Sequence, residues 1–216
     1  MLLQSVSKNS LLLGLFALVI ATGLALTHSG TRDRIEQAER AARQSALFEI
    51  VPPEQHDNDL LLDVQPVPEH AWPQLGLKQA ADISIARRQG EVIAVIIPAV
   101  APDGYSGDIS LITGVNRDLG IAGVRVVNHN ETPGLGDKLE LKKGPWILSF
   151  NGRSLGSPAP EHWAVSKDGG VFDQFTGATI TPRAVVNQVK RVLEFAESHR
   201  DLLFAPAVSP PDLTHE

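Results

Sequence analysis

An uncharged apolar run near the amino terminus is the feature that most constrains this chain. Residues 11–27 read LLLGLFALVIATGLALT and include no charged side chain. As a helix they would span about 26 Å, close to the lower limit for crossing a bilayer. We predict a transmembrane anchor over residues 11–28, after a cytoplasmic N-terminus at residues 1–10. A cleaved signal peptide with Lys8 in its n-region is the alternative, although Ala25-Leu26-Thr27 is a poor cleavage site.

A stalk is expected next, over residues 29–53. Arg32 to Leu47 has a helical pattern with only a thin apolar stripe, and Pro52-Pro53 would end such a helix. This pattern predicts a solvated stalk helix, or a packing face for another membrane subunit.

The remaining chain predicts one compact α+β domain over residues 54–204, with an antiparallel sheet and flanking helices. Residues 54–80 carry several prolines and are expected to be irregular. Alternating apolar residues predict strands at 82–88, 91–97, 108–115 and 121–129, with a short candidate at 163–166. Thr181 is the expected cap of a final helix with Pro182 at its first position. The proline-containing tail, residues 205–216, is expected to be flexible.

Composition excludes several classes of function. The net charge is −6, so no basic field is available to bind nucleic acid phosphates. The chain has no cysteine, which excludes disulfides, a cysteine nucleophile and thiolate-held iron–sulfur clusters. A redox role would therefore need another cofactor.

Three hydroxyl groups stand just before the final helix. Thr176, Thr179 and Thr181 lie within six residues, beside the small residues Gly177 and Ala178. Free N–H groups and the positive end of the helix dipole would stabilise an anion at this place. The residues alone leave two interpretations open, a phosphate site and ordinary helix capping.

The run Asp173-Gln174-Phe175-Thr176-Gly177-Ala178-Thr179 resembles the flavinylation motif Asp-x-x-Ser/Thr-Gly-Ala-Thr of the FMN-binding domain family. That family includes the G subunit of the Rnf (Rsx) electron transport complex and the C subunit of the sodium-pumping NADH:quinone reductase. The resemblance implies that a flavin transferase cleaves FAD and leaves FMN esterified through its phosphate to Thr179. It also implies that the transferase reads Asp173 and Thr176.

Two further stretches resemble the same family. They are His129-Asn130-Glu131-Thr132-Pro133-Gly134-Leu135-Gly136 and Gly104-Tyr105-Ser106-Gly107-Asp108-Ile109. We expect the first to line the flavin, so that Glu131, Thr132, Leu135, Gly136 and Thr181 join the motif residues as cofactor-binding candidates. In this hypothesis the N–H groups of Leu135 and Gly136 bond ring oxygens, and the Leu135 side chain covers a ring face.

Simpler interpretations of these stretches stay open. Thr132-Pro133-Gly134 is a good turn by itself, and Asn130-Glu131-Thr132 matches a glycosylation pattern that is common by chance. His129 beside Glu131 supplies too few ligands to define a metal site. The tryptophans, Trp72, Trp146 and Trp163, are expected to serve as packing anchors, each with a smaller chance of contacting the flavin.

The resemblance also implies a setting. The chain would be an electron-carrying subunit of an Rnf-type ion-translocating oxidoreductase, with no catalytic residue of its own and no metal. It would be a single-pass protein of the bacterial inner membrane, with its domain on the periplasmic side. Its partners would be the other membrane and redox subunits and the flavin transferase. Alternatives are a C-type subunit of the sodium-pumping reductase, a regulatory FMN-binding module outside any pump, and a scaffold subunit without flavin.

Overall fold

The computed structural model describes residues 2–205, and within the first helix it leaves out the side chains at 2–9, 11, 26–27, 29–30, 32–36, 38–39 and 42. That helix, α1, runs from Leu2 to Phe48. The helix that was predicted to begin at Arg32 is therefore continuous with the predicted anchor segment at residues 11–28, because α1 has no break between them. It ends one residue after the predicted Leu47. The chain divides into two compact units, and the second begins at Gln44.

Among the residues that the structure describes, no helix is long and apolar enough to cross a membrane. The predicted anchor at residues 11–28 includes Leu11, Leu26 and Thr27, whose side chains lie outside the description. Most of the predicted tail, residues 206–216, also lies outside the described residues.

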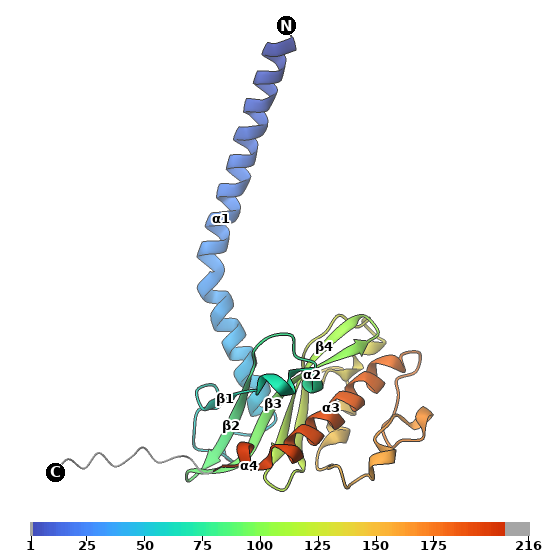
Figure 1. Cartoon of the computed structure of the whole chain (residues 1–216). Helices are drawn as coiled ribbons and strands as arrows, with labels where there is room; N and C mark the ends of the chain where they lie inside the picture. Colours follow the sequence, from blue (N-terminus) through green and yellow to red (C-terminus); the bar gives the residue numbers. More distant parts are fainter. Residues whose placement is uncertain (1, 206–216) are drawn as a thin grey trace, which may run out of the picture. The chain divides into compact units, whose positions relative to one another are not determined.

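The second unit is built on a five-stranded antiparallel sheet in the order β1-β2-β3-β4-β5 (Figure 1). The strands are β1 (Val64–Pro66), β2 (Asp82–Arg88), β3 (Glu91–Gly104), β4 (Gly107–Asn116) and β5 (Ile121–Asn128). The predicted α+β class and antiparallel sheet are thus confirmed. Gln89 and Gly90 both have positive φ, 55° and 81°, as expected for the tight turn of a β-hairpin.

The structure differs from the prediction in three places. Strand β3 continues seven residues past Ile97, because Pro98 lies beyond the last residue that pairs with β2 and so its missing N–H costs no bond there. The segment expected to be irregular contains β1, the 3-10 helix η1 (Glu69–Ala71) and the short helix α2 (Trp72–Leu75). The strand expected at 163–166 is only a single bridge between Val165 and Phe172.

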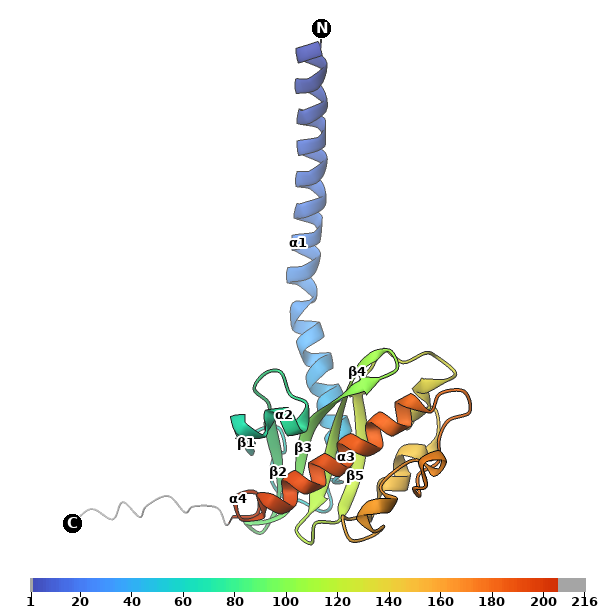
Figure 2. The same ribbon diagram turned by 45° about the vertical axis from the view of Figure 1, so that its right-hand side comes forward.

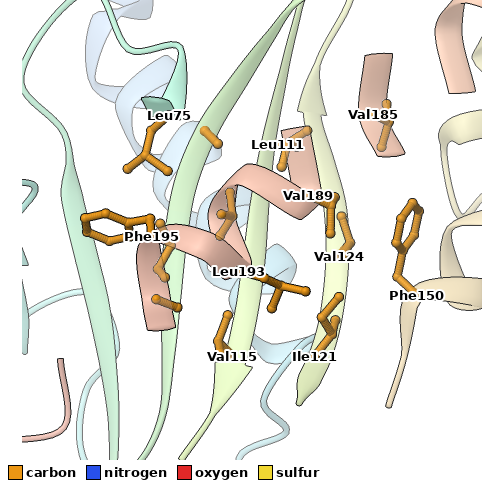
Figure 3. Close-up of a cluster of buried hydrophobic side chains, with 14 of the residues drawn as sticks. Leu75, Leu111, Val115, Ile121, Val124, Phe150, Val185, Val189, Leu193 and Phe195 are labelled. Atoms are coloured by element: carbon orange, nitrogen blue, oxygen red, sulfur yellow. The ribbon is translucent and has the colours of Figure 1, made fainter. Parts of the chain in front are cut away.

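The long helix α3 (Ile180–Ser198) crosses one face of the sheet (Figure 2). Its apolar stripe is buried as predicted, and Figure 3 shows Val189 beside Val124 and Leu193 near Val115 and Ile121. A short helix, α4 (Arg200–Leu203), follows. This packing holds the start of α3 at one end of the sheet, where the candidate site lies.

The opposite face of the sheet is covered by the segment that begins at Gln44. Leu47, Ile50 and Val51 are buried there in a second apolar cluster with β2 and β3 residues. A Cβ atom built at Gly114 would overlap the Ile50 Cγ2 methyl, so glycine is needed for this approach. Arg125 adds a polar tie from β5, because its Nε donates to Glu49 Oε2 at 2.7 Å and an Nη2–H donates to Glu49 O at 3.0 Å.

Candidate functional site

A tight turn presents the middle of the predicted attachment run. The Ala178 N–H donates to Phe175 O at 3.0 Å, and Gly177 has a φ of 80°. A positive φ at the third residue is typical of a type II turn and favours glycine there. Thr176 and Gly177 are exposed at the tip. The small residues of this run therefore shape the backbone, and they also leave the tip uncovered.

Thr179 is the N-cap residue of α3, and its hydroxyl makes no capping hydrogen bond. Thr181 was expected in this position, but the helix starts two residues earlier. Pro182 then occupies the third helical position, which it can do because the first N–H groups of a helix have no partner inside it. Thr179 is half-buried rather than sealed in the core. Its hydroxyl thus stands at the helix start without the structural task that a capping threonine normally has.

Glu131 joins three segments beside this helix start. Its Oε1 accepts from the Ser106 N–H at 2.9 Å, and its Oε2 accepts from the Thr181 hydroxyl. Glu131 is only 5% exposed and Thr181 is fully buried. A Cβ built at Gly136 would lie 2.6 Å from Glu131 Oε2 and 3.0 Å from Thr181 Oγ1. Gly136 therefore leaves the room in which this hydrogen-bonded group fits.

The loop that contains Glu131 is held by its own hydrogen bonds. The N–H groups of Leu135 and Gly136 both donate to Thr132 O at 3.1 Å, and the Gly134 N–H donates to Asp137 Oδ1 at 2.7 Å. The first two groups were expected to bond ring oxygens, and here they are already engaged within the turn. The Leu135 side chain is 43% exposed and lies against Gly177, with Cδ2 3.8 Å from the Cβ position of that glycine.

Both ring nitrogens of His129 also make hydrogen bonds. Its Nδ1 accepts from the Glu131 N–H at 3.0 Å, so its Nε2 carries the proton and donates to Glu140 Oε1 at 3.0 Å. Among the described residues, no group of three or more histidine, aspartate or glutamate side chains is placed to hold a metal ion.

Trp146 contacts the predicted attachment run at two residues. Its indole N–H donates to Asp173 O at 2.7 Å, and its ring packs edge-on against Phe175 with centroids 5.0 Å apart. The Asp173 carboxylate itself is on an exposed residue. The other two indole N–H groups also donate to backbone carbonyls, Trp72 to Val67 and Trp163 to Ser154.

An ion pair ties a neighbouring loop to the first turns of α3. Arg183 donates from Nε and Nη2 to the two oxygens of Asp168, at 2.6 and 2.9 Å. The hydrogen bond from Arg183 lowers the pKa of Asp168, and the same bond raises the pKa of Arg183. The pair is partly exposed, so it orients the loop more than it stabilises the fold.

Thr176, Gly177 and Ile180 are exposed around the predicted attachment turn. A pocket of about 160 Å³ lies near the other end of α3, lined by Asp118, Leu119, Ser154, Leu155, Gly156, Leu193 and Glu197. The turn and the Leu135 loop contact each other through Leu135 and Gly177. Leu135 and Ile180, 43% and 44% exposed, offer apolar area there.

The structure therefore brings together nearly all of the predicted site residues. Thr176, Gly177, Ala178 and Thr179 form the turn and the helix start, and Glu131, Leu135, Gly136 and Thr181 lie beside them. Thr132 supplies its carbonyl to the loop, and Asp173 flanks the run. Ser106, Trp146 and Asp168 were not among the predicted site residues, because hydrogen bonds between segments so far apart leave no local pattern. The stretch from Gly104 to Ile109, which resembles the family, was the sequence signal for Ser106, and Trp146 was expected mainly as a packing anchor.

Two family models match the chain. Residues 104–194 match the FMN-binding domain, and residues 1–50 match the RnfG N-terminal region. Curated relatives described as the G subunit of an ion-translocating oxidoreductase complex align over nearly their whole length. One from Pseudomonas aeruginosa is 52% identical over 203 residues, 94% of each chain. One from Shewanella piezotolerans is 46% identical, covering 94% of this chain and 96% of the relative. One from Pseudoalteromonas atlantica is 44% identical, covering 94% and 93%.

Proposed function

This chain belongs to the family of G subunits of ion-translocating oxidoreductase complexes, and we propose that it is the membrane-anchored flavin carrier of an Rnf-type complex. In this proposal FMN is attached covalently, through its phosphate, to Thr179. The observation that carries the attachment is the Thr179 hydroxyl, which stands at the N-cap of α3 yet makes no capping hydrogen bond. The backbone dihedrals of Thr179 are helical (φ −72°, ψ −28°) rather than the extended values of a capping residue, so its hydroxyl does not serve as a cap.

The attachment is a redox-neutral transfer. The Thr179 hydroxyl oxygen forms a bond to the FMN phosphorus of FAD, and the bond from that phosphorus to the AMP oxygen breaks. AMP leaves with the electron pair of that bond, and the hydroxyl proton is released. A flavin transferase serves as the maturation partner, and exposed Asp173 and Thr176 are the residues that it would read.

Features of this chain favour a phosphodiester at that position. The N–H groups of Ile180 and Thr181 lie in the first turn of α3, where no partner exists within the helix, and the dipole of a 19-residue helix is positive at this end. Leu135 and Ile180 supply exposed apolar surface for a ring. When bound, FMN supplies reversible electron transfer, and the protein contributes position, burial and hydrogen bonds.

In this proposal residues 11–28 anchor the chain in the bacterial inner membrane as a single-pass protein, with the domain on the periplasmic side. The large apolar side chains described in this segment are 45–68% exposed, namely Leu12, Leu13, Leu15, Phe16, Leu18, Val19, Ile20 and Leu24. A helix that is apolar on all sides is typical of a membrane span. A covalent tether also prevents loss of the flavin by dilution outside the cytoplasm.

The other membrane and redox subunits of the complex are the proposed partners. A C-type subunit of the sodium-pumping reductase would instead co-purify with the subunits of that enzyme. A regulatory module outside any pump would co-purify with neither set. Affinity purification of the full chain from its native membrane therefore separates the three functions.

Intact-mass measurement tests the attachment. The full-length chain, produced together with a flavin transferase, is expected to be heavier than its sequence mass by one FMN less one water. Thr179→Ala should lose this increment, and Thr179→Ser should keep it because the hydroxyl is retained. Covalent FMN on the alanine variant would overturn the assignment, and an unmodified wild-type chain would favour the flavin-free scaffold.

The absence of cysteine allows a clean test of topology. Asn187→Cys, on the exposed side of α3, should react with a membrane-impermeant maleimide applied to intact spheroplasts. Ser10→Cys, on the other side of the anchor, should react only after lysis. The reverse labelling pattern would contradict a periplasmic domain.

A further inference from the structure

We infer that Glu131 is a positioning residue for flavin attachment, and that its bond with Thr181 replaces the helix cap that Thr179 does not provide. This inference rests on the proposed function, because it assigns Thr179 as the acceptor. It reassigns Glu131 and Thr181, which were expected to contact the flavin, to a buried group that holds the acceptor in place.

The first turn of α3 lacks the usual means of staying formed. Its leading N–H groups have no partner inside the helix, and Pro182 has no N–H to donate. A capping side chain normally bonds one of these groups from an extended backbone, but Thr179 has helical dihedrals (φ −72°, ψ −28°) and its hydroxyl makes no such bond. The first bond that closes the helix near Thr179 is the one from the Arg183 N–H to Thr179 O, which is long at 3.3 Å.

Thr181 supplies a tie from outside the helix. It is fully buried two residues after Thr179, and its hydroxyl donates to Glu131 Oε2. Glu131 is held in turn by the Ser106 N–H at 2.9 Å, from the hairpin between β3 and β4. The start of α3 is thereby fastened to the sheet through a carboxylate that accepts from two other segments at once.

Direct contact between Glu131 and the phosphate is disfavoured by charge. A carboxylate and a phosphodiester are both anionic, and both Glu131 oxygens already accept hydrogen bonds. Two negative charges that lie close to each other repel. Glu131 therefore acts through Thr181, by holding in place the first turn of α3, which follows directly on the half-buried Thr179.

The test compares matched variants of the unmodified full-length chain. Each is incubated with flavin transferase and FAD, and covalent loading is followed by intact mass at several concentrations of the chain. Thr181→Val removes the hydroxyl but keeps the shape, whereas Thr181→Ser keeps the hydroxyl. Glu131→Ala removes the carboxylate, whereas Glu131→Gln can still accept from Ser106 and donate to the Thr181 oxygen.

Loss of one bond to a charged group in a buried place should slow loading by about tenfold or more in Thr181→Val and Glu131→Ala. We expect kcat to fall, with KM for the acceptor chain nearly unchanged, because Asp173 and Thr176 stay exposed for recognition. The serine and glutamine variants should load within about threefold of the wild type. Hydrogen exchange of the amides at residues 180–184 should accelerate in the valine variant before any flavin is added.

Ile50→Ala serves as a control for general destabilisation, because Ile50 packs on the opposite face of the sheet. Equal loss of loading in that variant, or wild-type loading and exchange in Thr181→Val, would overturn the inference. If the wild-type chain gains no mass, the proposed function fails instead. If the wild type loads and all four site variants load equally well, only the role of Glu131 is wrong.

Discussion

Replacing Gly136 by alanine should slow flavin loading at Thr179 by more than its effect on the stability of the fold explains. The added methyl would lie 2.6 Å from Glu131 Oε2, 2.9 Å from Glu131 Cβ and 3.0 Å from Thr181 Oγ1. Ordinary van der Waals separations are about 3.5–4.0 Å, so these atoms must move apart by roughly half to one ångström. No positive φ is found at this glycine, so packing rather than backbone strain determines the result.

Overpacking by one methyl group costs about 1–3 kcal/mol. For a unit of this size, each kcal/mol lowers Tm by about 2–4 °C, so the expected decrease is about 2–12 °C. Gly114→Ala is the matched control, since it adds the same methyl to another buried glycine without positive φ, against Ile50 on the far face. Its expected loss of stability is at least as large, because that methyl would lie 2.2 Å from Ile50 Cγ2.

The assay pairs thermal unfolding, followed by circular dichroism, with the rate of covalent flavin loading. Both glycine variants should unfold at lower temperature, but only Gly136→Ala should load slowly at a temperature where both are folded. Equal loading rates in the two variants would refute the reasoning. An unchanged Tm in Gly136→Ala would mean that the loop moves aside at no cost, and the packing argument would then be wrong.

Three further outcomes are expected. Ile50→Ala should destabilise the second unit by about 2–5 kcal/mol in denaturant unfolding. The double variant Ile50→Ala and Gly114→Ala should lose less stability than the sum of the two single variants, because the alanine methyl at position 114 then occupies the space left by the Ile50 side chain. Strictly additive losses would argue against the contact. Because Arg183 lowers the pKa of Asp168 below its ordinary 3.8, the ion pair should stabilise the fold at neutral pH and be lost as pH falls through the lowered value. Asp168→Asn should thus unfold more easily than the wild type at pH 7 and equally at the acid end; a difference that persists there would contradict the ion pair. Asp173→Ala should keep the circular dichroism spectrum and lose flavin loading, and full loading would remove Asp173 from transferase recognition.

Local sequence patterns determined the parts of this protein whose structure depends on neighbouring residues. Alternation of apolar residues predicted β2, β4 and β5 to within one residue at each end, and Gln89-Gly90 predicted the hairpin turn. The apolar stripe of α3 was also predicted from the sequence, because a helix repeats its buried face every 3.6 residues. The attachment run was identified from its resemblance to a known motif.

Tertiary structure decided what periodicity cannot encode. Thr181 is fully buried while Thr179 is half-buried at the helix start, and the partner of Thr181 is a carboxylate 50 residues away in the chain. The covering of the second sheet face by Ile50 depends on Gly114 and on the order of the strands. A sequence pattern records that a side chain is buried or polar, but its partner is chosen by the topology, which brings distant segments within hydrogen-bonding distance only after the sheet has formed.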